Sequence, residues 1–99
     1  MGVTGWGRLQ LRRIRRDLAT LPDPAILMGD LNMVAPRPVR VTGYRSLAEH
    51  PTFPLEDPDR QLDHVLARGE VGRMVDSRAV RLPLSDHRAL VVELAEPGQ

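Results

Sequence analysis

The sequence predicts an α/β domain, and three neighbouring features near its start indicate this. Apolar residues recur at helical spacing between residues 8 and 21, prolines follow at positions 22 and 24, and residues 25–28 are apolar without a break. Recurrence every three to four residues gives a helix one apolar face, and a short unbroken apolar run is typical of a strand buried on both faces. A helix, a tight turn and a strand form one α/β unit.

The predicted helix spans residues 8–21. Its apolar face is expected in the core and carries Leu11, Ile14, Leu18 and Leu21. Arginines fill the other faces, at positions 8, 12, 13, 15 and 16. We interpret these arginines as a solvated outer surface, with phosphate steering as the alternative.

The predicted strand at residues 25–28 ends in a glycine, after which two polar residues follow. Gly29 frees the backbone to turn. Side chains at i and i+2 of an extended chain project to the same side, so we expect Asp30 and Asn32 to reach together beyond the strand's carboxyl end. In open α/β sheets ligands bind in the crevice at that end.

Residues 33–61 hold five of the nine prolines and are predicted to be mostly loop, with one helical turn at residues 46–50 as an alternative. Long loops in compact domains are often functional. Three further strands are predicted at residues 62–67, 75–82 and 89–94, with a turn at 69–72. The ends of the chain, residues 1–7 and 96–99, are expected to be disordered.

Composition limits the function classes. The chain has no cysteine, which excludes disulfides and thiolate metal sites. No run reaches the roughly 18 apolar residues of a membrane span, and no apolar segment follows the N-terminal basic residues as in a signal peptide. A cytoplasmic location is therefore the default expectation. All 14 basic residues are arginine, and the net charge of +1 favours no particular partner.

Two later stretches resemble residues 25–32, because each places an aspartate and a histidine beside apolar residues typical of a strand. They are Leu62-Asp63-His64-Val65-Leu66 and Ser85-Asp86-His87. His64 is interpreted as a structural residue of its strand, and His50, in the loop, as exposed to solvent rather than catalytic.

These residue types suit hydrolysis of a phosphoester. Asp86 and Asp30 are candidates to contact Mg²⁺ or its waters, since carboxylates supply the hard oxygens this ion prefers. His87 is the candidate general base and Asp63 the carboxylate that orients it. The Asn32 carboxamide can hold a phosphoryl oxygen. Together a metal, a base and a donor form a set for attack of water on phosphorus.

The three motifs, taken in order, resemble the C-terminal motifs of the endonuclease/exonuclease/phosphatase (DNase I-like) superfamily. The resemblance covers about residues 8–95 and implies a four-layer α/β sandwich, with two mixed sheets face to face and helices outside. It implies that Asp30 handles the nucleophile or leaving group and Asn32 contacts the phosphate. It also implies that Asp63 orients the base His87 and that Asp86 binds metal. Whether Asp30 or His87 activates the water stays open.

The resemblance stops short of the family's N-terminal half, which supplies an Asn, a metal-binding Glu and a further His. Glu49 and Glu56 lie in the proline-rich loop and match no family position. Residues 1–99 are therefore expected to form a partial domain with the N-terminal half absent, weak or inactive alone. One sheet face would be left bare as an apolar patch.

The implied activity is Mg²⁺-dependent phosphoester hydrolysis, with Mn²⁺ as an alternative ion. A nucleic acid, a phosphoinositide and a phospholipid head group stay open as substrates. The loop carries Arg37, Arg40 and Arg45, but the loop has only one Tyr and one Phe, which argues against a sequence-reading nuclease. The rival interpretation is a catalytically dead remnant that acts as an interaction module.

Overall fold

Two antiparallel sheets and two helices make up the chain in the computed structural model, which describes residues 7–83 and 85–96. In chain order the elements are α1 (Arg8–Ala19), β1 (Ala25–Asp30), α2 (Arg37–Thr42), β2 (Arg45–Ser46), β3 (Asp63–Arg68), β4 (Arg73–Val80) and β5 (Ala89–Ala95). The first sheet has the order β1-β3-β2, and the second is the β4-β5 hairpin. The fold is thus a small mixed α/β domain.

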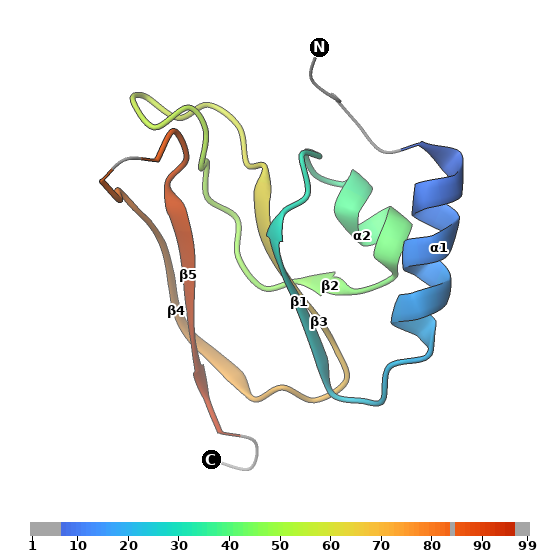
Figure 1. Cartoon of the computed structure of the whole chain (residues 1–99). Coiled ribbons are helices and arrows are strands. Elements are labelled where there is room, and N and C mark those ends of the chain that lie inside the picture. The colour runs from blue at the N-terminus through green and yellow to red at the C-terminus, as the bar shows by residue number, and fades with distance from the viewer. Residues whose placement is uncertain (1–6, 84, 97–99) are drawn as a thin grey trace.

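The core lies between the helices and the first sheet. Both helices cover one side of β1 and β3, and the β4-β5 hairpin lies on the other side (Figure 1). Leu18 of α1, Tyr44 and Leu66 of β3 are buried together, and half-buried apolar residues pack around them: Ile14, Ala25, Leu27 and Leu31. Leu66 is fully buried because it lies on the helix-facing side of the central strand.

The register of β1 on β3 decides which side chains share a face. Leu27 lies opposite Leu66, and Asp30 lies opposite Asp63. Because successive side chains of a strand alternate between faces, Asp30 and Asp63 project away from the Leu27–Leu66 core. The two carboxylates therefore lie on the sheet side that carries the hairpin.

Strand β1 is not buried on both faces, and that prediction is wrong. Ile26 is 43% exposed and Met28 is 67% exposed, whereas Leu27 packs into the core. The physical reason is that β1 is the edge strand of an antiparallel sheet and the helices cover only one of its faces.

Helix α1 ends at Ala19, two residues before the predicted end. Leu18 is buried as expected and Ile14 packs against it, but Leu21 lies past the helix and is 46% exposed. The backbone N–H of the C-cap residue Thr20 bonds to the carbonyl of Asp17, which closes the last turn.

The loop prediction missed a helix and misplaced a turn. Residues 37–42 form α2, whereas residues 46–50 are not helical in the structure. Pro38 lies in the first turn of α2 and Gly43 caps it in the left-handed conformation with φ 75°. Proline near the start and glycine just after the end are ordinary helix boundaries, so the signal was present in the sequence.

The three later strands were predicted to within two residues, but their arrangement was not. Strand β3 joins the first sheet, and β4 and β5 form a separate hairpin after a turn at residues 69–72. Gly69, with φ 79°, lies close to Asp23 in that turn. A side chain there would be crowded, since a Cβ at residue 69 would lie 3.0 Å from the Cβ of Asp23. The expected disorder of residues 1–6 and 97–99 lies outside the described residues.

None of the helices in the described ranges is long and apolar enough to cross a membrane.

Candidate active site

Two carboxylates face each other where β1 ends and β3 begins. Asp30 is the last residue of β1, Asp63 is the first of β3, and the two are paired in the antiparallel register. Like charges at directly opposed positions destabilise a sheet. The pair therefore needs a positive partner, which marks this end of the sheet as a candidate functional site.

That partner is His87, which lies in the segment between β4 and β5. Its Nδ1 is 2.6 Å from Oδ2 of Asp63, and its Nε2 is 3.6 Å from Oδ2 of Asp30. One ligand atom from each of the three residues fits within a mutual distance of 4.8 Å. The His87 and Asp63 side chains are 20% and 21% exposed, whereas Asp30 is 47% exposed and opens the cluster to solvent.

The partners of His87 fix its tautomer. An ionised carboxylate only accepts hydrogen bonds, so Nδ1 must donate to Asp63. In the neutral ring Nε2 is then the lone-pair nitrogen, and it faces Asp30 at the more exposed side of the cluster. A ring held in this way can take a proton at Nε2 while the Asp63 carboxylate stabilises the positive charge.

The surrounding charges raise the pKa of His87 above its ordinary value. Burial alone lowers the pKa, but the hydrogen bond to Asp63 and the Asp63 charge outweigh burial. The negative charges of Asp30 and Asp86 raise the pKa further. The imidazole is thus well placed to hold a proton once it has accepted one.

The backbone turns sharply after Asp30, so the expected extended placement of Asp30 and Asn32 is wrong. Asn32 has φ 52°, and its backbone N–H donates to Oδ1 of Asp30 at 2.8 Å. This local hydrogen bond occupies one carboxylate oxygen and leaves Oδ2 toward His87. Asn32 is exposed beside the cluster, where a phosphate contact stays a prediction.

Asp86 is exposed and lies next to His87 in the chain, but it does not belong to the group of three. Its charge acts on the His87 pKa, and the Ser85 hydroxyl accepts the His87 N–H at 3.1 Å. Metal binding by Asp86 stays a prediction.

Residues 52 and 53 border the site and were not singled out in the sequence. Thr52 is fully buried, and the Phe53 ring lies 4.8 Å from the His87 ring, tilted by 52°. Phe53 limits the freedom of the imidazole on that side. Their stretch, Pro51-Thr52-Phe53-Pro54, reads as a proline-punctuated loop, so the pattern gave no functional signal.

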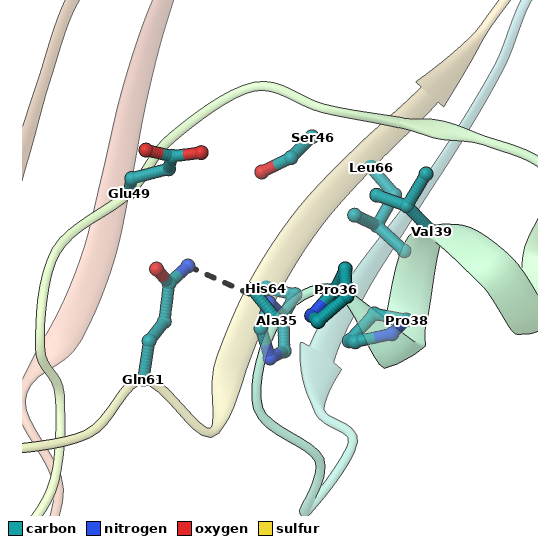
Figure 2. Close-up of a pocket in the computed structure, with 9 residues that line it drawn as sticks. All are labelled: Ala35, Pro36, Pro38, Val39, Ser46, Glu49, Gln61, His64 and Leu66. Carbon is teal, nitrogen blue, oxygen red and sulfur yellow. Dashed lines mark hydrogen bonds between the residues drawn. The ribbon is translucent and has the colours of Figure 1, made fainter.

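Behind the site, Gln61 and His64 are among the polar residues that line a pocket of about 180 Å³ near α2 (Figure 2). His64 is buried, and its Nε2 donates to the Met33 carbonyl at 2.6 Å. Gln61 donates to the Asp63 carbonyl at 3.0 Å. His64 thus has a structural place in the core, as its strand position suggested. His50 is half-buried and bonds to Ser77 at 2.8 Å, so it is less exposed than expected.

The donor set fits a hard divalent cation in part. Asp30 and Asp63 offer carboxylate oxygens, which Mg²⁺ and Mn²⁺ accept, and the imidazole suits Mn²⁺ better than Mg²⁺. Mg²⁺ takes six ligands at near-ideal octahedral geometry. The three groups fall short of that number, so waters, substrate oxygens or further carboxylates must complete the shell.

A half-buried histidine, hydrogen-bonded to one carboxylate and facing a second at a sheet end, is an arrangement that suits general-base chemistry. A sequence model of the endonuclease/exonuclease/phosphatase family matches residues 2–87. The chain belongs to that family, and membership indicates phosphoester hydrolysis in general. No curated protein and no solved structure gives a significant match to the chain.

Proposed function

We propose that this chain supplies the general base of a Mg²⁺-dependent phosphoester hydrolase, with Mn²⁺ as an alternative ion. The single observation behind the proposal is the placement of His87, with Nδ1 2.6 Å from Asp63 and Nε2 facing Asp30. Family membership supports the same reaction class.

In this mechanism His87 takes the proton from the attacking water at Nε2, and Asp63 holds the ring and offsets its charge. Asp30, the more exposed carboxylate, lies on the open side of the cluster, where it would hold the cation together with Asp86. The bound cation would supply positive charge to a phosphoryl oxygen. Asn32 would contact the phosphate from the turn after β1.

The proposal extends to the fold, in which the two sheets are part of a four-layer sandwich. The uncovered β1 edge, with Ile26 and Met28 exposed, supports this extension because an apolar edge strand favours pairing with further strands. A further half would supply the remaining carboxylate for the cation. We therefore expect the 99 residues alone to hydrolyse little or no bis(p-nitrophenyl) phosphate.

One of the loop arginines, Arg45, lies away from the candidate site. Arg45 donates to the Gly69 carbonyl at 2.7 Å, which places it at the opposite end of β3 from Asp63. A small phosphoester is thus favoured over a sequence-read nucleic acid, and phosphoinositide and phospholipid head groups are both included.

The first test is binding of Mn²⁺, which broadens NMR signals near its site. Signals of Asp30 and Asp86 should broaden first, followed by those of the neighbouring His87 and Asp63, and Asp30→Asn should reduce that effect. Broadening centred on another acidic cluster would contradict the site, whatever the activity.

The second test is kinetic and uses the chain supplied with a family N-terminal half as a second chain. His87→Ala and Asp63→Asn should each lower kcat strongly, since a general base contributes about 10²–10⁴-fold. The double variant should be little worse than His87→Ala, because Asp63 acts through the ring. His64→Ala, whose side chain points into the core, is the control. Losses that multiply would reassign the base, and no activity in any arm would favour the interaction module.

A further inference from the structure

Thr52 lies between the chain segments that carry Asp63 and His87. It is fully buried, with an exposure of 0%. Buried hydroxyl groups are almost always hydrogen-bonded, and here both the side chain and the backbone of Thr52 have partners. Those partners belong to the two chain segments that carry Asp63 and His87.

The Thr52 hydroxyl holds the start of β3. Its Oγ1 accepts the backbone N–H of Leu62 at 3.1 Å and that of Asp63 at 3.3 Å. The backbone N–H of Thr52 donates to the Arg60 carbonyl at 2.9 Å, which fixes the loop beside the same segment. The loop that contains Thr52 therefore fixes the Asp63 backbone at the first residue of β3.

The Thr52 carbonyl holds the other half of the pair. It accepts the backbone N–H of Arg88, the residue after His87, at 2.7 Å. The Arg88 side chain bonds to the Leu55 carbonyl at 3.0 Å, so the loop contacts this segment twice. One buried residue thus connects directly to both chain segments that carry the Asp63–His87 pair.

We propose that Thr52 is the positioning residue that aligns Asp63 with His87, an inference that rests on the proposed function of that pair. Asp63 and His87 are 24 positions apart in the chain: Asp63 begins β3 of the first sheet, and His87 lies in the segment that joins the two strands of the second sheet. A hydrogen bond of 2.6 Å between them needs their backbones fixed relative to each other, and Thr52 contacts the backbone of Asp63 and that of Arg88, the residue next to His87.

The experiment compares Thr52→Val with Thr52→Ser in the full 99-residue chain. Valine has nearly the same shape as threonine and lacks the hydroxyl acceptor, whereas serine keeps the acceptor and loses only a methyl group. The readout is the Nδ1 proton of His87, seen by NMR as a downfield, slowly exchanging signal while it is bonded to Asp63. The Nε2 proton of His64, bonded to Met33, is the control within the same molecule.

We expect Thr52→Val to lose the His87 signal or to speed its exchange about tenfold or more, because the N–H groups of Leu62 and Asp63 both lose their acceptor. The His64 signal should stay, and Thr52→Ser should restore the His87 signal. A His87 signal that survives in Thr52→Val would overturn the proposal. So would a loss of both histidine signals in a folded Thr52→Val chain, because that pattern indicates a general structural role.

Hydrogen exchange in the unaltered chain decides the matter if Thr52→Val does not fold. The amide protons of Asp63 and Arg88 should be protected and should exchange at a common rate, because the same residue holds both. Unprotected or unrelated exchange would overturn the role of Thr52. This readout needs no activity, so a failure of the proposed hydrolysis and a failure of the Thr52 proposal are distinguishable.

Discussion

Asp30 and Asp63 illustrate, at the scale of single residues, how two closely placed like charges lower stability. Their carboxylates occupy opposed positions on β1 and β3, and His87 lies close to both. When the imidazole is protonated it offsets this charge. When it is neutral, the two carboxylates repel each other without compensation, so the cost of the pair depends on pH.

The first prediction concerns Asp30→Asn in metal-free chain above the pKa of His87. Removing one charge should raise the free energy of unfolding by about 0.5 kcal/mol, the usual scale of a cross-strand charge pair. The asparagine keeps an oxygen that accepts the Asn32 N–H, so the turn is preserved. Urea unfolding at alkaline pH with EDTA measures the change. The exposed Glu49→Gln is the control, and a loss of stability in Asp30→Asn would contradict the prediction.

The second prediction follows from the raised pKa of His87. Between the unfolded and the folded pKa the folded chain binds more protons, so stability falls as pH rises through that window. The contribution of His87 is complete below its unfolded pKa and is lost above its folded pKa. Urea unfolding of metal-free chain between about pH 6 and pH 9 should show this decline.

His87→Gln is the matched variant for this decline, because glutamine cannot take up the proton. Its free energy of unfolding should change less over the same pH range than that of the unaltered chain. Parallel pH profiles for the two chains would show that the His87 charge does not stabilise the fold.

At the scale of elements, the C-terminal end of α1 depends on side chains from elsewhere. The Leu18 carbonyl accepts hydrogen bonds from the Tyr44 hydroxyl at 3.2 Å and from Nη1 of Arg68 at 2.7 Å. Arg68 also bonds to the Leu21 carbonyl and pairs with Asp23 at 2.6 Å. Since the last carbonyls of a helix lack partners within it, these contacts fasten α1 to β3.

The third prediction is that Arg68→Leu lowers the free energy of unfolding by about 2 kcal/mol, because hydrogen bonds from a charged donor are lost at the helix end. Amide exchange in the last turn of α1 should also become faster. Denaturant unfolding and hydrogen exchange measure the two effects. Arg73→Leu, an exposed position on β4, should change neither, and equal effects of the two variants would contradict the role of Arg68.

Sequence patterns located most elements because those elements depend on local spacing. The α1 periodicity and the apolar run of β1 predicted a helix and a strand that the structure contains. Helix α2 was missed because the proline-rich composition outweighed the Pro38 and Gly43 boundary signals. The direction in which the strands pair could not be predicted either, since it depends on contacts between residues distant in sequence.

Part of the candidate site could be predicted from the sequence for the same reason. Asp30, Asp63 and His87 were singled out by their position beside apolar runs, and the structure brings these three together. The turn at Asn32 was not foreseen, because a positive φ depends on the local hydrogen bond to Asp30. Thr52 gave no pattern at all, since its role comes only from tertiary contacts.

At the scale of the whole molecule, strand β1 is a sheet edge with an exposed apolar face among the described residues. Strand β1 pairs only with β3, and its outer face exposes Ile26 and Met28. Residues 25–28 contain no charge and no proline, which are the usual means of blocking an edge strand. The free backbone groups of β1 and this apolar face therefore form a surface that favours pairing with another strand.

The fourth prediction is that the 99-residue chain associates with itself through β1 as its concentration rises. Met28→Lys should shift the chain toward monomer, because a charge at the centre of the edge opposes close pairing with a second copy. Leu9→Lys is the matched control, since Leu9 is even more exposed, at 71% against 67%, but lies on α1. Sedimentation velocity over a range of concentrations measures both variants. If Leu9→Lys dissociates the assembly as well as Met28→Lys does, general apolar exposure drives association and the edge has no special part in it. If the unaltered chain stays monomeric throughout, the twist of β1 or the neighbouring charge of Asp30 is enough to protect the edge.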